Sequence, residues 1–289
     1  MFKKKKDQTY QSYWSISWNI FKKNKVAMVC LFIVILLCLI ALFAPLIAPY
    51  DPNKQVRTDR LMKPCGQHWF GTDDLGREIF SRIIYGCRVS LSVGIISQII
   101  ATVIGYTMGV CAGYYGGKVD SVISFLIQVF SSFPFLLFAM AIMFVLGPGL
   151  INLYLALGLL GWASTARLIR GDVMRLKKME YIDACKVSGG NSFRIIMKHL
   201  LPNCLSTLIV TVTLGIPNAI MSEASLSFLG LGVKAPMASW GSMISFSQPY
   251  IRSATYYSVI PGLAIIITVL AFNMLGDGLR DALDPKLRS

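Results

Sequence analysis

The residues best suited to catalysis are too few and too scattered in this chain to form an active site within its apolar segments. A hydroxyl nucleophile or a metal ion is usually served by a histidine close by. The only two histidines, His68 and His199, lie outside the apolar segments, and the acidic residues near those segments fall toward their ends: Asp120, Glu223 and Asp277. We therefore expect no metal site, no enzyme and no carrier driven by charges at mid-membrane.

The chain also lacks the glycine-rich loop with which ATPases hold phosphate. The nearest approach, Gly116-Gly117-Lys118-Val119, has neither the leading glycine spacing nor the hydroxyl that would bind magnesium. We expect no cofactor in this chain. If the chain serves active transport, another polypeptide must supply the energy.

The composition is typical of a protein that lies in a lipid bilayer. Of the 289 residues, 55% are apolar and 15% charged, whereas about 25% charged residues is usual in soluble proteins. The first long apolar run, residues 26–48, holds 23 residues without a charge, and roughly 20 suffice to cross the hydrocarbon. Because the apolar region of a signal peptide has only roughly 7 to 15 residues, we expect this run to be a membrane span.

Six apolar runs predict six transmembrane helices and an all-α fold. They cover residues 26–48, 89–112, 119–146, 150–169, 205–221 and 258–275, with about 20 residues as the template for a span. The runs are rich in small and hydroxyl residues, which permit close helix packing and polar contacts away from water: Gly94, Ser97, Thr102, Gly105, Gly109, Thr207, Thr211 and Thr213. An even number of spans places both termini on one side.

The distribution of Lys and Arg predicts the orientation. The topology divides the chain into tails of residues 1–25 and 281–289, the first span, an outer loop of residues 49–88, and a core of residues 89–280 with five spans and an inner segment of residues 170–202. Of the 28 Lys and Arg residues, 19 lie on the side of the termini and 9 on the other side. Since positive residues concentrate in the cytoplasm, we expect cytoplasmic termini.

The net charge and the cysteines point to lipid and to packing. The charge of +14 comes from residues that flank the spans, so we expect contact with anionic lipid and not with nucleic acid. The seven cysteines contain no CxxC pair and are interpreted mainly as small apolar residues. Cys65 and Cys87, both expected outside, could pair in an oxidising compartment.

The inner segment between the fourth and fifth spans is long for a helix connection, which usually has about 2 to 8 residues. Residues 172–188 contain no Gly or Pro and predict a helix that Gly189-Gly190 ends, and residues 192–201 predict a short helix that Pro202 ends. The first helix carries small residues four apart and acids three apart. Such a helix could lie flat on lipid or contact another protein, and its acids disfavour an anionic surface.

Four stretches of this chain resemble the membrane-spanning subunits of bacterial ATP-binding-cassette importers. The stretch from Glu180 to Gly189, with Leu201-Pro202-Asn203 after it, resembles their EAA loop, although Asp183-Ala184-Cys185 stands where Glu-Ala-Ala is usual. The other three are HWFGTDDLGREIFSRIIYGCRVSLSVG (68–94), EASLSFLGLGVKAPMASWGSMI (223–244) and FNMLGDGLRDALDPKLR (272–288). These are similar to the C-type subunit of the dipeptide, oligopeptide and nickel permease branch.

This resemblance, which covers nearly the whole chain, implies a type I ABC importer permease fold with a cytoplasmic coupling helix. It also implies a heterodimer with a sister permease subunit, two cytoplasmic ATPase subunits that bind ATP and Mg, and an extracytoplasmic substrate-binding protein. In the family the coupling helix sits in a cleft of an ATPase subunit. The residues expected to serve this contact are Glu180, Tyr181, Asp183, Ala184, Cys185 and Gly189.

The outer loop carries a turn-rich motif before a predicted helix. In Gly71-Thr72-Asp73-Asp74-Leu75-Gly76-Arg77, either aspartate could cap the helix or pair with Arg77 or Arg82. The resemblance implies that this loop faces the binding protein, while turn geometry alone also explains the motif. The residues singled out here are Gly71, Thr72, Asp73, Gly76, Arg77 and Arg82.

Two prolines and an irregular outer segment suggest a path and a gate. Pro134 and Pro217 should interrupt the third and fifth spans, and the residues that would line a polar path beside them are Ser131, Ser132, Thr213 and Asn218. Residues 225–253 mix apolar residues with Gly and Pro and predict a short re-entrant piece, with Trp240 and Tyr250 at the membrane interface. Structural kinks and ordinary loop packing are the alternatives.

By this resemblance the chain is expected to be a permease subunit of a short-peptide importer in a bacterial plasma (inner) membrane. A nickel or metal-chelate importer is the alternative, since selectivity in such systems lies largely with the binding protein. A stand-alone secondary carrier would need internal repeats and charges at mid-membrane, and the sequence has neither.

Overall fold

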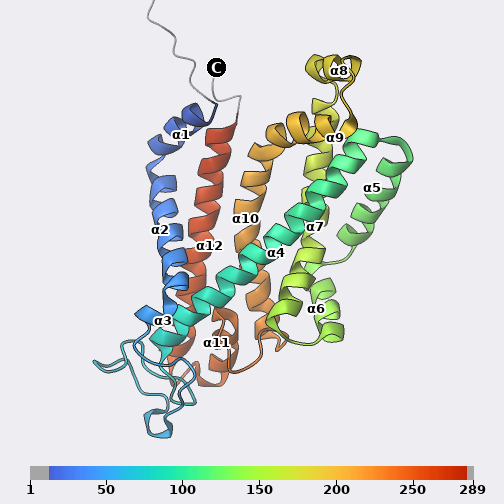
Figure 1. The fold of residues 1–289 in the computed structure, drawn as a ribbon. Helices are drawn as coiled ribbons and strands as arrows, with labels where there is room; N and C mark the ends of the chain where they lie inside the picture. Colours follow the sequence, from blue (N-terminus) through green and yellow to red (C-terminus); the bar gives the residue numbers. More distant parts are fainter. Residues whose placement is uncertain (1–12, 285–289) are drawn as a thin grey trace, which may run out of the picture.

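The computed structural model describes residues 13–284, which form an all-helical bundle (Figure 1). Within that range no strand forms, and one isolated β-bridge joins Thr72 to Glu78. The α-helices are α1 (Tyr13–Lys23), α2 (Lys25–Leu42), α3 (Ala44–Ile47), α4 (Ile79–Tyr115), α5 (Gly117–Ser132), α6 (Phe135–Leu146), α7 (Leu150–Leu176), α8 (Glu180–Val187), α9 (Ser192–Ile195), α10 (Leu201–Phe228), α11 (Trp240–Ser247) and α12 (Thr255–Leu283). The expected all-α membrane fold is confirmed.

The described helices supply four clear membrane spans. By length and composition these are Lys25–Leu42, Ile79–Tyr115, Ser192–Phe228 and Thr255–Leu283, and α5 and α6 together meet the same test as a pair bent by 90°. This gives four or five spans against the six expected. The remaining one corresponds to α7, which has 27 residues but is less apolar because polar residues interrupt it, among them Asn152, Ser164 and Thr165.

The two prolines behave differently. Phe133 is extended (φ −93°, ψ 140°) between α5 and α6, as expected for a residue before a proline, and Pro134 thus accounts for the break in the third predicted span. Pro217 lies inside α10, which runs through it. The helix is therefore not broken at Pro217, and the kink expected there stays a prediction.

Helix α4 begins earlier than expected. It starts at Ile79 and has 37 residues, a length of about 55 Å, whereas the sequence suggested a span from residue 89. Figure 1 shows α4 crossing the bundle obliquely. A helix longer than the hydrocarbon core, which is about 30 Å thick, must tilt or project beyond it. The irregular part of the outer loop consequently ends at residue 78.

Glycines bring α4 against its neighbours, as the small residues of the spans predicted. A Cβ on Gly105 would lie 2.6 Å from the Thr165 Cβ of α7, and a Cβ on Gly109 would lie 2.7 Å from the Ala166 carbonyl oxygen. A Cβ on Gly94 would likewise lie 2.9 Å from Ile220 Cγ1 of α10. Larger side chains at these positions would push the helices apart.

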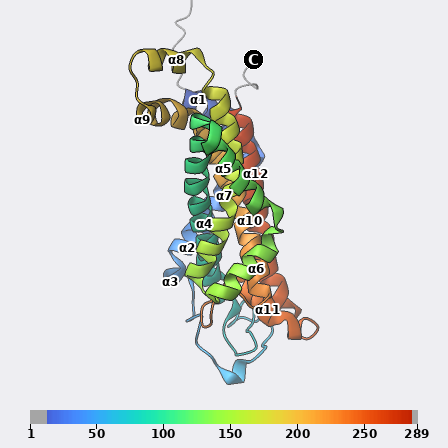
Figure 2. The same cartoon turned by 90° about the vertical axis from the view of Figure 1, so that its right-hand side faces the viewer.

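The two ends of the bundle differ. In Figures 1 and 2, α8, α9, the start of α1 and the end of α12 lie at one end, and α8 projects sideways beyond the packed helices. The irregular outer loop, α3 and α11 lie at the opposite end. The first and last described residues therefore share one end, as an even number of crossings requires.

The seven cysteines are all free thiols in the described part of the chain. Cys65 is exposed in the outer loop, whereas Cys87 is buried on α4 and its thiol donates to the Leu37 carbonyl oxygen at 3.5 Å. The disulfide considered between Cys65 and Cys87 is therefore not formed.

Candidate functional site

The inner segment consists of short helices separated by turns. The single helix expected over residues 172–188 is wrong: α7 continues to Leu176, and α8 begins at Glu180 after a break. Pro202 does not end the next helix either. It lies in the first turn of α10, where a proline lacks only an N–H that has no helical partner, and a π turn (Ile196–Leu200) joins α9 to α10.

Helix α8 is anchored by one buried residue and closed by two glycines. Ile182 is fully buried and packs in a cluster with Ile195 and Leu200. Gly189 has a φ of +78°, its N–H donates to the Lys186 carbonyl at 3.0 Å, and the N–H of Gly190 donates to the Cys185 carbonyl at 2.9 Å. This left-handed closing turn favours glycine, as the sequence predicted.

The other residues of α8 face outward. Asp183 and Lys186 form the expected pair, at 2.7 Å. Of the six residues expected to contact an ATPase, Cys185 is half-buried and the others are exposed: Glu180, Tyr181, Asp183, Ala184 and Gly189. Two exposed apolar side chains beside them were not predicted, Val187 at 89% exposure and Phe193 at 72%. The feature of the sequence that could have identified them is an apolar residue in a segment that otherwise faces water.

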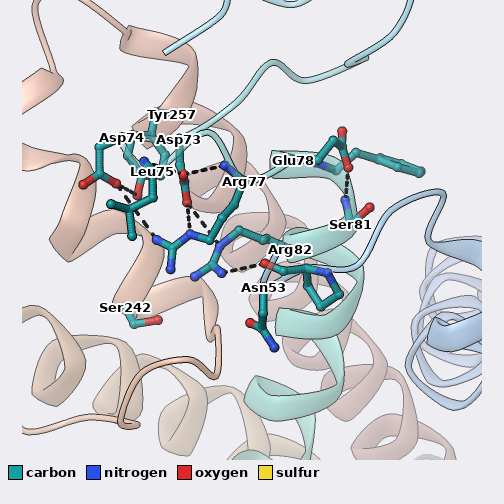
Figure 3. A network of polar contacts seen from close by, with 12 residues as sticks. Asn53, Asp73, Asp74, Leu75, Arg77, Glu78, Ser81, Arg82, Ser242 and Tyr257 are labelled. Atoms are coloured by element: carbon teal, nitrogen blue, oxygen red, sulfur yellow. Dashed lines mark hydrogen bonds and ion pairs between the residues drawn. The ribbon is translucent and has the colours of Figure 1, made fainter. Parts of the chain in front are cut away.

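The outer loop is organised around one buried carboxylate. Figure 3 shows Asp73 with two guanidinium groups directed at it. Asp73 Oδ2 lies 2.6 Å from Arg77 Nε and 3.5 Å from Arg82 Nε. Asp73 Oδ1 accepts from the N–H of Leu75 and of Arg77, both at 2.9 Å. The aspartate thus forms ion pairs with two arginines and accepts hydrogen bonds from the turn, as one of the interpretations of the motif predicted.

Arg82 and Asp74 extend this network to distant segments of the chain. Arg82 Nη1 donates to the Pro52 carbonyl at 2.9 Å, and Asp74 accepts from the Tyr257 hydroxyl at 3.2 Å. Because Asp73, Arg77 and Arg82 are buried, the network holds the outer loop to α4 and α12.

The glycines and the helix cap complete the motif. Gly71 and Gly76 both have positive φ, and a Cβ on Gly76 would overlap the Val56 carbonyl. The N-cap of α4 is Glu78, which accepts from Phe80 N at 3.1 Å and Ser81 N at 2.6 Å. The cap expected at Asp73 or Asp74 is thus wrong, and Glu78 was not predicted. Thr72 is also buried and donates to the Asp59 carbonyl.

The second outer segment folds into a short helix. Helix α11 packs against α10 and α12, in agreement with the irregular, non-spanning piece expected. Trp240 is 1% exposed, its Nε1 donates to the Ile83 carbonyl at 3.1 Å, and it packs on Gly86. Trp240 is therefore a core residue, and its expected position at the membrane interface is wrong.

A cavity of about 460 Å³ lies between α4, α6, α7 and α10. Its polar lining residues are Ser97, Gln98, Ser164, Asn218, Ser222 and Ser225. Of the residues predicted for a path or gate, Asn218 alone is among those that line it. Ser131 instead accepts from Arg167 at 3.0 Å, and Thr213 donates to the Ile209 carbonyl at 2.9 Å.

Ser132 and Pro134, two more of the predicted path residues, are not among those that line the cavity. Ser132 donates to the Gln128 carbonyl at 2.7 Å, and Pro134 precedes Phe135, which lines the cavity. Gln98 was missed, although an amide within an apolar run is a signal for a functional position. Within residues 13–284, no group of three or more His, Cys, Asp or Glu side chains is arranged to hold a metal ion.

Comparison with known proteins identifies related chains. The family described as "Binding-protein-dependent transport system inner membrane component" matches residues 102–289, and the "N-terminal TM domain of oligopeptide transport permease C" matches residues 12–64. The dipeptide transport system permease protein DppC of Bacillus subtilis is 45% identical over 96% of this chain and 87% of its own length.

Two further curated relatives carry related names. The glutathione transport system permease protein GsiD of Pectobacterium atrosepticum is 41% identical over 98% of this chain and 95% of its own. The oligopeptide transport system permease protein OppC of Bacillus subtilis is 41% identical over 96% and 91%.

A solved structure shares the fold. A chain of the MetNI methionine ABC transporter, in an inward-facing conformation, superposes with a TM-score of 0.58 at 19% identity, covering 71% of this chain and 98% of that chain. Together with the apolar helices of the bundle, the matches along almost the whole sequence lead to one conclusion. This chain belongs to the family of inner membrane components of binding-protein-dependent transport systems.

Proposed function

We propose that this chain is one membrane-spanning subunit of an ATP-driven importer of short peptides. The observation that carries the proposal is the similarity to DppC, 45% identity along 96% of the chain. The relatives named for dipeptide, oligopeptide and glutathione transport all handle short chains of amino acids. Peptides are therefore the substrate class that these relatives share.

The chain works with four other subunits in this proposal: a sister permease, two ATPases that bind ATP and Mg, and an extracytoplasmic binding protein. The position of the cavity supports the proposal of a sister permease. Asn218 lines the cavity and is exposed in the isolated chain, and polar side chains turned toward lipid are costly. A second permease subunit would cover this side and complete a path between the two chains.

The end of the bundle that carries α8 is cytoplasmic in this proposal. The Lys and Arg residues of the inner segment gather there, together with the basic start of α2, and positive residues prefer the cytoplasmic side. Both chain termini would then be cytoplasmic, and the outer loop and α11 would face the binding protein. Trp69, 64% exposed in that loop, offers an apolar contact there.

The contact with the ATPase is made by α8. Its exposed acids, Glu180 and Asp183, would meet polar or basic groups of the ATPase, while Ala184 and Cys185 permit close approach. Val187 and Phe193 add apolar surface to the same segment. Because Ile182 fixes α8 to the buried cluster, a push on α8 would reach α10 directly.

Uptake by the complete assembly tests this function. Proteoliposomes that contain both permeases and both ATPases are supplied on the outside with the loaded binding protein. They should accumulate radiolabelled trialanine when ATP is enclosed in the lumen on the side of the ATPase subunits, and not when ADP replaces it. Accumulation of a nickel chelate instead of the peptide would identify the metal importer. ATP hydrolysis that ignores the loaded binding protein would count against an importer of either kind.

A further inference from the structure

The cavity between α4, α6, α7 and α10 is lined by both polar and apolar side chains and by no charged one. Its volume of about 460 Å³ lies in the range of roughly 300 to 1,000 Å³ that is usual for small-molecule sites. Among the described residues that line it, hydroxyls and amides occur but Asp, Glu, Lys and Arg do not. It would therefore attract hydrogen-bonding groups without selecting a charge.

The serines of the cavity face it as hydrogen-bond acceptors. Ser164 donates to the Gly161 carbonyl at 3.0 Å, and Ser222 and Ser225 donate to the carbonyls four residues before them at 2.8 and 2.9 Å. A hydroxyl has one proton to donate and two lone pairs. Because the proton of each is used within its own helix, the lone pairs remain for a group in the cavity.

The amide of Asn218 is arranged in the same way. One N–H of its Nδ2 donates to the Leu214 carbonyl at 3.1 Å, so its Oδ1 remains as a further acceptor at the cavity wall beside the second N–H. The chemical complement of this set of acceptors is a molecule with several N–H groups.

Ser97 supplies an independent observation. It is 2% exposed, it lines the cavity, and its Oγ has no hydrogen-bond partner within the described part of the chain. A buried hydroxyl without a partner costs about 1 to 3 kcal/mol, so native proteins rarely keep one without a reason. Unlike the other serines, Ser97 still has its proton available for an acceptor such as a carbonyl oxygen.

We propose that this cavity is a transit site that binds the backbone of the peptide. The acceptors of α7 and α10 take the backbone N–H groups, and Ser97, once its buried side chain turns toward the cavity, donates to a backbone carbonyl. Backbone groups are common to all peptides, and the wall carries no charge, so the site accepts side chains of either sign. This inference rests on the proposed function and adds the group of the substrate that this chain contacts.

A charge placed in the cavity tests the proposal. The complete assembly is reconstituted with its binding protein, and uptake of Ala-Ala-Ala, Ala-Glu-Ala and Ala-Lys-Ala is measured with the binding protein saturated. The Asn218→Asp variant should lower the uptake ratio of Ala-Glu-Ala to Ala-Lys-Ala roughly tenfold relative to the wild type, because like charges a few ångströms apart repel strongly in a partly dehydrated site.

Two further variants make the result specific. Ser222→Asp adds a charge to the same wall and should shift the ratio in the same direction, even if Asn218→Asp does not assemble. Asn203→Asp makes the same chemical change on α10 outside the cavity, where Asn203 is exposed and donates to the His199 carbonyl at 2.6 Å. It should leave the ratio unchanged.

The outcomes separate the two proposals. If the wild type imports peptides and both cavity variants keep the wild-type ratio, the proposal of a transit site is refuted, and the proposed function as a peptide importer is retained. The same holds if Asn203→Asp shifts the ratio as much as Asn218→Asp. If the wild type imports none of the three peptides, the proposed function itself is overturned.

Discussion

Arg77 Nε lies 2.6 Å from Asp73 Oδ2, and the two side chains are 7% and 0% exposed. Arg82 approaches the same oxygen at 3.5 Å. One carboxylate therefore serves two buried guanidinium groups, and the fold of the outer loop depends on its charge.

Replacement of Asp73 by Asn should destabilise the protein. The variant keeps the shape but leaves two buried positive charges without their anion, and removal of one partner from a buried pair costs about 3 to 5 kcal/mol. The melting temperature of the purified assembly should fall by roughly 5 °C or more. Asp74→Asn is the control, because Asp74 is 4.0 Å from Arg77 and partly exposed. Equal shifts for the two variants would contradict the assignment.

The contacts of this network within residues 71–77 could be predicted from the sequence. Asp73 and Arg77 are four residues apart in a stretch with two glycines, so pairing within a turn was the natural interpretation. The Pro52 carbonyl and Tyr257 could not be predicted, since they meet the motif only through tertiary folding. The burial of the motif also depends on those distant segments.

Glu180→Lys should uncouple transport without unfolding the protein. Glu180 is exposed on α8, so the substitution should leave the melting temperature within about 2 °C of the wild type, as is usual for surface changes. A reversed charge in the proposed ATPase contact should lower both peptide uptake and the ATP hydrolysis stimulated by loaded binding protein, by roughly tenfold or more. Both activities are measured in proteoliposomes.

Asp277→Lys is the matched control for that substitution. Asp277 is exposed near the end of α12, at the same end of the bundle and outside α8. The control should retain both activities. Survival of uptake and stimulated hydrolysis in Glu180→Lys would refute the coupling role of α8.

The faces of α8 show why a pattern of residues was insufficient there. In a continuous helix over residues 172–188, the sequence spacing alone would decide which residues share a face. The break between Leu176 and Glu180 gives α8 its own axis, so its faces cannot be read from the residues before it. The small residues and the acids were correctly expected on a water-facing helix. The exposure of Val187 and the burial of Ile182 follow from how the new helix rests on the cluster, which no local pattern encodes.

Ile182→Ala should loosen α8 locally. Ile182 is fully buried in the cluster, and such a truncation costs about 2 to 5 kcal/mol. Because α8 projects from the bundle, the loss should appear as faster amide hydrogen exchange in residues 180–190, by about thirtyfold or more, with little change in the transmembrane helices. Val187→Ala, at an 89% exposed position, is the control and should leave exchange unchanged. Equal acceleration in both variants would show that Ile182 is not the anchor.

Gly215→Ala tests the wall of the cavity. A Cβ at this position would overlap Gln98 Cδ and Oε1, so the side chain of Gln98 must leave its place, where its Nε2 donates to Thr102 Oγ1 at 3.3 Å. Overpacking of this kind costs about 1 to 3 kcal/mol, and the melting temperature of the assembly should fall accordingly.

The second substitution Gln98→Ala should relieve that clash. If the overlap is the cause, Gln98→Ala in the Gly215→Ala background should recover most of the lost stability, and the two changes should be strongly non-additive. Additive losses would mean that Gly215 is required for the backbone of α10 beside Pro217 and not for Gln98. Since Gln98 and Gly215 both line the cavity, the recovered double variant should have a larger cavity, and its peptide uptake then reports whether the amide of Gln98 itself contributes to transit.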